Sequence, residues 1–103
     1  MRLRLSKFAY DDLNSIYAYT LGIWEQGQAD RYITHLWDSL ETLAKDPEHW
    51  RIRDELYPGC RVRITGKHAI LYRLHDDRVE ISRILHGSMD FTRHIPPDFM
   101  GGE

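Results

Sequence analysis

The side chains best suited to do chemistry in this chain are three arginines and one histidine in its C-terminal half. Arg61, Arg63 and Arg83 could hold a phosphate group through charge-assisted hydrogen bonds. His86 could act as a general acid or base near neutral pH. Together they could support cleavage of a phosphodiester. The simpler interpretation of a lone histidine at a strand end is a structural hydrogen bond, so a catalytic set is an alternative and not the leading prediction.

Arg83 lies in an otherwise apolar stretch. The residues that share its strand face at two-residue spacing are Val79, Ile81 and Leu85. An arginine in an apolar row needs a partner. We expect either a salt bridge to a carboxylate such as Asp90 or Glu80, or a position in an anion-binding cleft.

Arg61 and Arg63 alternate with the residues Cys60, Val62 and Ile64, which predicts that the two arginines share one face of a strand. We expect this face to be the solvated one. It is either an inert polar surface or a place where an acidic or amphipathic partner segment binds by charge complementarity.

The sequence predicts no metal and no cofactor. Six histidines show no ligand spacing, and the single cysteine, Cys60, cannot complete a thiolate site. There is also no glycine-rich phosphate loop and no nucleophile elbow.

Periodicity and turn residues predict a strand, two helices and three further strands. In order, these cover residues 2–5, 8–24, 28–45, 61–64, 69–74 and 79–85. Ser6 is placed to cap the first helix. The short link between the helices predicts an antiparallel hairpin, and the short loops between the last strands predict an antiparallel meander. The expected fold is a two-layer α/β (α+β) domain.

Aromatic residues are concentrated in the helical half. Tyr10, Tyr17 and Trp24 follow one another at seven-residue spacing, on nearly one line of the first helix. We expect Tyr17 and Trp24 to contribute to the core and Tyr10 to contact a partner.

Length and composition indicate one globular domain. With 103 residues, 42% of them hydrophobic, the chain has room for a single core, which we place in residues 1–95, with a flexible tail over residues 96–103. One cysteine fits a reducing cytoplasm. No apolar run is long enough to span a bilayer and the N-terminus lacks the apolar stretch of a signal peptide, so we expect no membrane association.

Charge is unevenly distributed along the chain. Residues 1–59 hold 7 Lys/Arg against 10 Asp/Glu, whereas residues 60–95 hold 7 against 4. An excess of three positive charges is a weak electrostatic footprint. We therefore predict no direct sequence-specific DNA binding.

The order of strand, helical hairpin and three-stranded meander resembles ParE toxins of the RelE/ParE type II toxin–antitoxin superfamily. The resemblance covers nearly the whole chain. The matching segments are Ala9-Tyr10-Asp11-Asp12-Leu13, Gly27-Gln28-Ala29, Leu43-Ala44 before Pro47, Gly59-Cys60-Arg61, Arg83-Ile84-Leu85-His86 and Met89-Asp90.

This resemblance implies a bacterial toxin that inhibits DNA gyrase without catalysis of its own and is neutralised by a ParD-like antitoxin in a hetero-oligomer. The expected effector surface consists of Arg83, His86, Met89, Asp90, Arg93 and His94. The expected antitoxin-binding residues are Tyr10, Leu13, Tyr17, Arg61, Arg63 and Arg73. Two alternatives stay open: a ribosome-dependent mRNA endonuclease of the RelE type that uses Arg61, Arg63, Arg83 and His86, and a non-toxic module that only binds an antitoxin.

Overall fold

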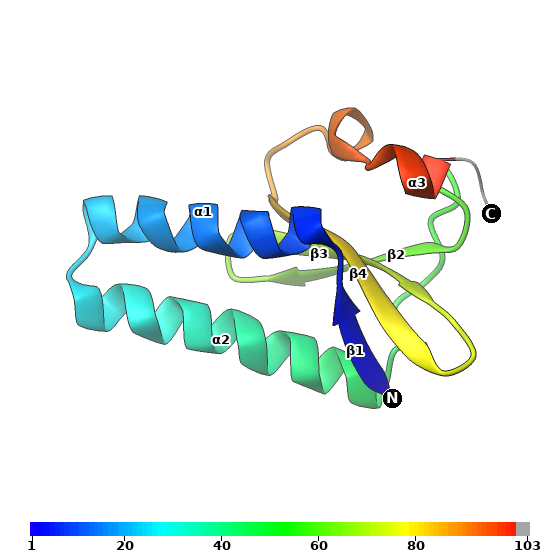
Figure 1. Ribbon diagram of the computed structural model, residues 1–103, viewed down its shortest axis with the longest axis horizontal. Helices are drawn as coiled ribbons and strands as arrows, with labels where there is room; N and C mark the ends of the chain where they lie inside the picture. Colours follow the sequence, from blue (N-terminus) through cyan, green and yellow to red (C-terminus); the bar gives the residue numbers. More distant parts are fainter. Residues whose placement is uncertain (101–103) are drawn as a thin grey trace.

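A helical hairpin covers one face of a four-stranded sheet in the computed structural model of the chain (Figure 1). The structure describes residues 1–100. Along the chain the elements are β1 (Arg2–Leu5), α1 (Lys7–Ile23), α2 (Gln26–Lys45), β2 (Cys60–Thr65), β3 (His68–Leu74), β4 (Arg78–His86), the 3-10 helix η1 (Phe91–His94) and α3 (Pro97–Met100). The predicted order of elements and the two-layer α+β class are confirmed.

The strand order in the sheet is β1-β4-β3-β2. Strands β2, β3 and β4 form the predicted antiparallel meander, and β1 pairs in parallel with the first half of β4. A parallel neighbour requires a crossover connection, which the chain between β1 and β4 provides through the helical hairpin. Because β1 ends at Leu5, opposite Ile81, no strand within residues 1–100 lies beside the second half of β4 on that side.

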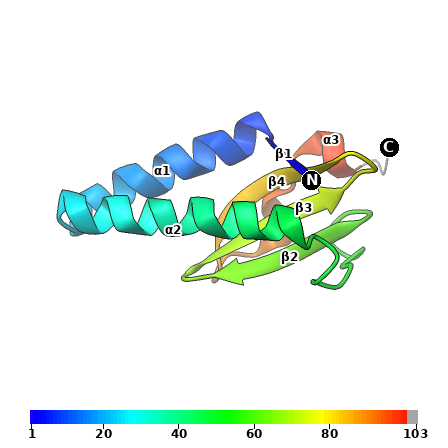
Figure 2. The same ribbon diagram turned by 90° about the horizontal axis from the view of Figure 1, so that it is seen from below.

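Ser6 joins β1 to the helical hairpin. Its hydroxyl accepts a hydrogen bond from Ala9 N–H at 3.0 Å, as an N-cap does, and donates to Ser82 O at 2.8 Å. The main core lies between the hairpin and the sheet, as the view from below shows (Figure 2). Its fully buried residues include Leu36, Leu40 and Ile70.

Strand β4 contains a bulge that the sequence analysis did not predict. The register places Arg83 opposite Leu71 and Ile81 opposite Tyr72, so Ser82 is the extra residue. Its buried hydroxyl donates to Leu71 O at 3.0 Å and lies 2.8 Å from Tyr57 Oη. The expectation that Arg83 shares a face with Val79 and Ile81 is therefore wrong, because the bulge reverses the alternation.

A second, smaller core lies on the other face of the sheet. It includes Leu56, Tyr57, Cys60 and Leu71, and the C-terminal segment closes it with Phe99, which is 4% exposed. The sequence predicted a flexible tail from residue 96, but residues 97–100 form α3 because Phe99 buries its ring against Tyr57. Residues 101–103 of that predicted tail lie outside the described residues.

None of the helices in residues 1–100 combines the length and the apolar character that a membrane span requires.

Candidate functional site

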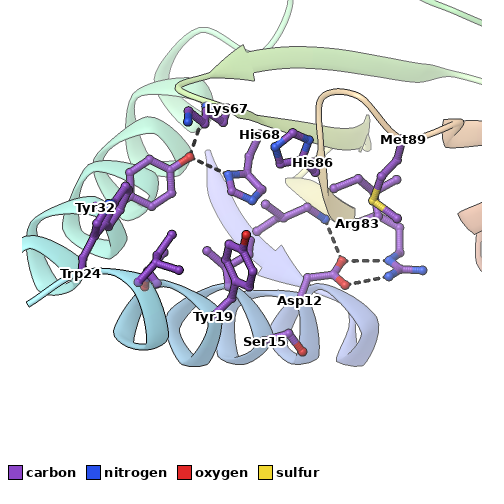
Figure 3. A pocket seen from close by; sticks show the side chains of 15 residues that line it. Asp12, Ser15, Tyr19, Trp24, Tyr32, Lys67, His68, Arg83, His86 and Met89 are labelled. Atoms are coloured by element: carbon purple, nitrogen blue, oxygen red, sulfur yellow. Dashed lines mark hydrogen bonds and ion pairs between the residues drawn. The ribbon is translucent and has the colours of Figure 1, made fainter. Parts of the chain in front are cut away.

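A cleft of about 410 Å³ opens between α1 and the adjoining ends of β3 and β4 (Figure 3). The side chains of its apolar wall include Ile16, Ile23, Trp24, Ile84 and Met89. The polar side chains in its lining include Asp12, Tyr32, His68, Arg83 and His86. An apolar cleft with a few convergent polar groups is the usual form of a binding site.

Asp12 and Arg83 form a two-pronged ion pair at one end of this cleft. Arg83 Nε and Nη2 donate to the two carboxylate oxygens of Asp12 at 2.8 and 2.6 Å, and Ile84 N–H donates to the same carboxylate at 2.8 Å. The Asp12 carboxylate holds the pKa of Arg83 above its usual range. Asp12 thus occupies the edge of β4 where β1 has ended, and it satisfies a backbone donor there.

The sequence analysis expected a carboxylate partner for Arg83 and named the wrong candidates. Asp90 accepts from Thr92 N–H at 3.2 Å and caps η1. Glu80 accepts instead from Arg73 and His75, at 3.2 and 2.7 Å. The ion-pair alternative therefore holds for Arg83, with Asp12 as its partner, and the paired arginine also lines the cleft.

Tyr32 and His68 meet at the other end of the cleft. Lys67 N–H donates to Tyr32 Oη at 3.2 Å, and Tyr32 Oη lies 2.5 Å from His68 Nδ1. The tyrosine hydroxyl therefore accepts from the Lys67 backbone and shares a second hydrogen bond with the His68 ring. Burial, and then the nearby His86 ring at 5.5 Å between centroids, lower the pKa of His68.

The predicted effector residues occupy the segment from the end of β4 to η1. Arg83, His86 and Met89 line the cleft. Arg93 is exposed, and the backbone carbonyl of His94 accepts from Arg83 Nη1 at 2.9 Å, which ties η1 to β4. The sixth residue, Asp90, is the N-cap of η1.

Three of the predicted antitoxin-binding residues line a second hollow, of about 360 Å³, between α1 and α2. Tyr10 is exposed there, whereas Leu13 is buried. Tyr17 is half-buried and its hydroxyl donates to Asp30 at 2.5 Å, a hydrogen bond that raises the pKa of Tyr17.

The other three predicted antitoxin-binding residues have partners within the chain. Arg61 donates to Trp50 O at 2.6 Å, and Arg63 donates to Ser39 O at 2.7 Å. Arg73 donates to Glu80 at 3.2 Å and lies over the Phe99 ring at 4.5 Å.

The expectation that Arg61 and Arg63 occupy a solvated face is wrong. Their register partners, Tyr72 and Ile70, belong to the core under the helices, so the arginines lie on the helix-covered face. They donate to backbone carbonyl oxygens, Arg63 to one within α2 and Arg61 to one in the loop that follows this helix. The four residues of the endonuclease alternative therefore do not form one site. Arg83 and His86 line the cleft, whereas Arg61 and Arg63 do not.

The sequence analysis missed Asp12, Tyr32 and His68 as parts of a site. In the sequence, Asp12 stands out only as part of a segment that resembles ParE toxins, and Tyr32 carries no signal of a site. The one local signal was Gly66, which has φ of +57° and whose missing Cβ would lie 3.0 Å from Tyr32 Oη. The sequence shows only a glycine in a turn. Its close approach to Tyr32 is seen only in the folded structure.

The chain is similar to known toxins over nearly its whole length. Residues 3–91 match the family described as ParE toxin of type II toxin-antitoxin system, parDE. Toxin ParE1 of Caulobacter vibrioides is 36% identical over 92 residues, which cover 89% of this chain and 95% of the relative. Toxin ParE1 of Mycobacterium tuberculosis is 32% identical over 95 residues, covering 91% and 97% respectively.

Two solved structures share the fold. A chain of the chromosomal ParDE toxin–antitoxin system of P. aeruginosa superimposes with a TM-score of 0.72 at 19% identity, covering 84% of this chain and 95% of that one. A chain of the toxin–antitoxin complex RelBE2 of Mycobacterium tuberculosis gives a TM-score of 0.63 at 22% identity, covering 82% and 95%. At these identities the likeness concerns the fold alone.

Proposed function

Because this chain belongs to the ParE toxin family of type II toxin–antitoxin systems, we propose that it inhibits DNA gyrase by binding, without catalysis of its own, and that a ParD-like antitoxin neutralises it in the cytoplasm. The proposed effector surface is the cleft wall and the segment that follows it, with Arg83, His86, Met89, Asp90, Arg93 and His94.

The observation that carries the binding mechanism is the Asp12–Arg83 pair. A phosphoryl-transfer site needs cations that are free to stabilise charge developing in the transition state. In this cleft the guanidinium of Arg83 is already neutralised by a carboxylate at 2.6 Å. The cleft is therefore better suited to hold a protein segment than to cleave a phosphodiester.

The antitoxin surface that we propose is the exposed side of α1. A surface helix normally presents polar residues to water. In contrast, α1 exposes the large side chains Tyr10, Tyr19, Leu21 and Ile23, and Tyr19 is 70% exposed. Tyr10 with Leu13 and Tyr17 lies in one hollow beside this helix, and Tyr19 with Ile23 lies in the cleft on its other side. An amphipathic antitoxin segment would cover these apolar side chains.

Induced expression in a bacterium tests the function. Growth, filamentation, the DNA-damage response and bulk protein synthesis are followed together, with and without a co-expressed antitoxin. We expect filamentation and damage signalling while translation continues, and rescue by the antitoxin. Normal growth with soluble protein would favour the antitoxin-binding module instead.

One observation favours the endonuclease as a second candidate. Tyr32, His68 and His86 form a group of titratable rings beside Lys67 in the cleft, and such a group could move protons. On that mechanism, toxin added to translating extract cuts mRNA, and His68→Gln abolishes cleavage while leaving the domain folded. Intact mRNA in the presence of active toxin contradicts it.

A further inference from the structure

Three arginines surround a hollow at the β1 edge of the sheet, beside the start of β4, whereas the cleft lies at the end of β4. The hollow measures about 270 Å³ and is lined by Arg2, Leu3, Arg4 and Arg78. Strand β1 forms this edge, beside β4 (Figure 1). Arg2 lies opposite Arg78 in the parallel register, and Arg4 follows two residues later on the same face of β1.

The positive charge here is only partly balanced by the chain itself. Asp77 lies 3.4 Å from Arg2 and 3.0 Å from Arg78. Arg4 has no ion-pair partner among residues 1–100, because its register neighbour Glu80 is engaged by Arg73 and His75. Three guanidinium groups thus lie around one hollow, and two of them share a single carboxylate, so the local positive charge is incompletely balanced and attracts an anion.

Two details indicate that these arginines have donors left for the oxygens of a ligand. Arg2 has 77% of its side chain exposed, so its donors are accessible. Arg78 has a buried Nε that finds no acceptor in the described part of the chain. A buried donor without an acceptor is costly, so the Arg78 side chain lacks a complete set of partners within residues 1–100.

The geometry favours a phosphate over a carboxylate. A carboxylate offers two oxygens in one plane, which a single arginine can satisfy. Asp77 already provides a carboxylate at this site. The oxygens of a phosphate point in several directions and can accept from several arginines at once. Arg2 and Arg4 are roughly 6.6 Å apart along the extended strand, a spacing similar to that of successive phosphates along a nucleic-acid strand.

We propose that Arg2, Arg4 and Arg78 bind the phosphate backbone of double-stranded DNA, without reading its sequence. Among residues 1–100, the lining of the hollow contains no aromatic ring on which an unpaired base could stack, so a duplex fits better than a single strand. The choice of DNA over RNA rests on the proposed function, because gyrase holds duplex DNA. In this arrangement the toxin contacts the DNA with its sheet edge at the start of β4, while the cleft at the end of β4 is free for protein.

Fluorescence anisotropy with a labelled DNA duplex tests this site directly. The toxin is titrated at several salt concentrations, and the slope of log affinity against log salt is measured. For Arg2→Gln/Arg4→Gln we expect affinity about tenfold lower at low salt and a slope less steep by about 2, since two phosphate contacts are lost. The matched control is Arg31→Gln/Arg51→Gln, which removes the same charge from two other exposed positions and is expected to retain binding.

Arg4→Gln alone provides a second test, because Arg4 has no ion-pair partner within residues 1–100 whose loss could unfold the domain. It is expected to reduce the slope by about 1. Equal losses in the test and control variants overturn the proposal, and so does tighter binding to an RNA duplex, an acidic peptide or anionic vesicles than to DNA. A toxin that does not bind DNA but still inhibits gyrase overturns this inference and leaves the proposed function standing.

Discussion

Asp12 and Arg83 are 71 residues apart in sequence and are joined by two hydrogen bonds of 2.8 and 2.6 Å, and the same carboxylate accepts from the backbone of Ile84. Both side chains are largely buried, Asp12 at 12% and Arg83 at 19% exposure. This contact ties the first helix to the last strand, neutralises the arginine that lines the cleft and covers the open edge of β4.

Asp12→Ala is expected to lower the free energy of unfolding by about 2–4 kcal/mol, because it leaves a buried guanidinium and a backbone N–H without partners. Urea denaturation measures the change. The control is Asp11→Ala at the neighbouring exposed position, with an expected change within about 0.5 kcal/mol. Similar effects of the two substitutions would show that the Asp12 contact is not a main support of the fold.

Two glycines with different surroundings provide a matched pair. Gly66→Ala should destabilise the domain by about 1–3 kcal/mol, since the backbone there has φ of +57° and a Cβ would lie 3.0 Å from Tyr32 Oη. Gly22→Ala meets nothing within 4 Å inside α1 and should stabilise by about 0.5–1 kcal/mol. Thermal unfolding of both variants checks the opposite signs. A stabilised Gly66→Ala protein is incompatible with the described turn.

Stability is expected to depend on pH through His68. Burial and the nearby His86 lower the pKa of His68 in the folded state, whereas an unfolded histidine titrates near 6.5. Between these two pKa values the unfolded chain binds more protons, so the free energy of unfolding falls as pH drops below about 6.5.

His68→Gln should flatten this dependence. Urea denaturation between pH 7.5 and 5.5 measures it, and NMR titration of the His68 ring gives the pKa itself. Glu80, whose pKa is lowered by hydrogen bonds from His75 and Arg73 despite its burial, loses its stabilising contribution only at more acidic pH. If the free energy of unfolding of the variant depends on pH as the wild type does, another group causes the effect.

Cys60 is expected to be unreactive in the folded protein. It is fully buried, and burial raises its pKa to about 11, so the thiol stays protonated at neutral pH. A thiol-specific reagent at pH 8 should label the protein only after denaturant is added. Rapid labelling without denaturant would mean that the small core around Tyr57 and Phe99 opens readily.

The elements could be predicted from sequence because each carries a local signal, whereas the contacts that form the cleft could not. The apolar stripe of α2 and the alternation in β2 are readable within one segment. The bulge at Ser82 is not, because it depends on hydrogen bonds to Leu71 and to Tyr57, which lies 25 residues away. That one extra residue moved Arg83 to the other face of the sheet and changed its partner.

The arginines of β2 illustrate the same limit. Alternation placed Arg61 and Arg63 on one face correctly, but it could not decide which face the helices cover. The apolar face of a strand is usually the covered one, yet here Val62 and Cys60 face a second core built by the C-terminal segment. The carbonyl oxygens of Trp50 and Ser39 then provide partners for the arginines under the helical layer.

The most direct test of the central claim is a supercoiling assay with purified gyrase and increasing amounts of the purified toxin. We expect dose-dependent loss of supercoiling, reversed by the antitoxin and weakened by substitution of Met89 at the mouth of the cleft. Normal supercoiling at a large molar excess of folded toxin would contradict it.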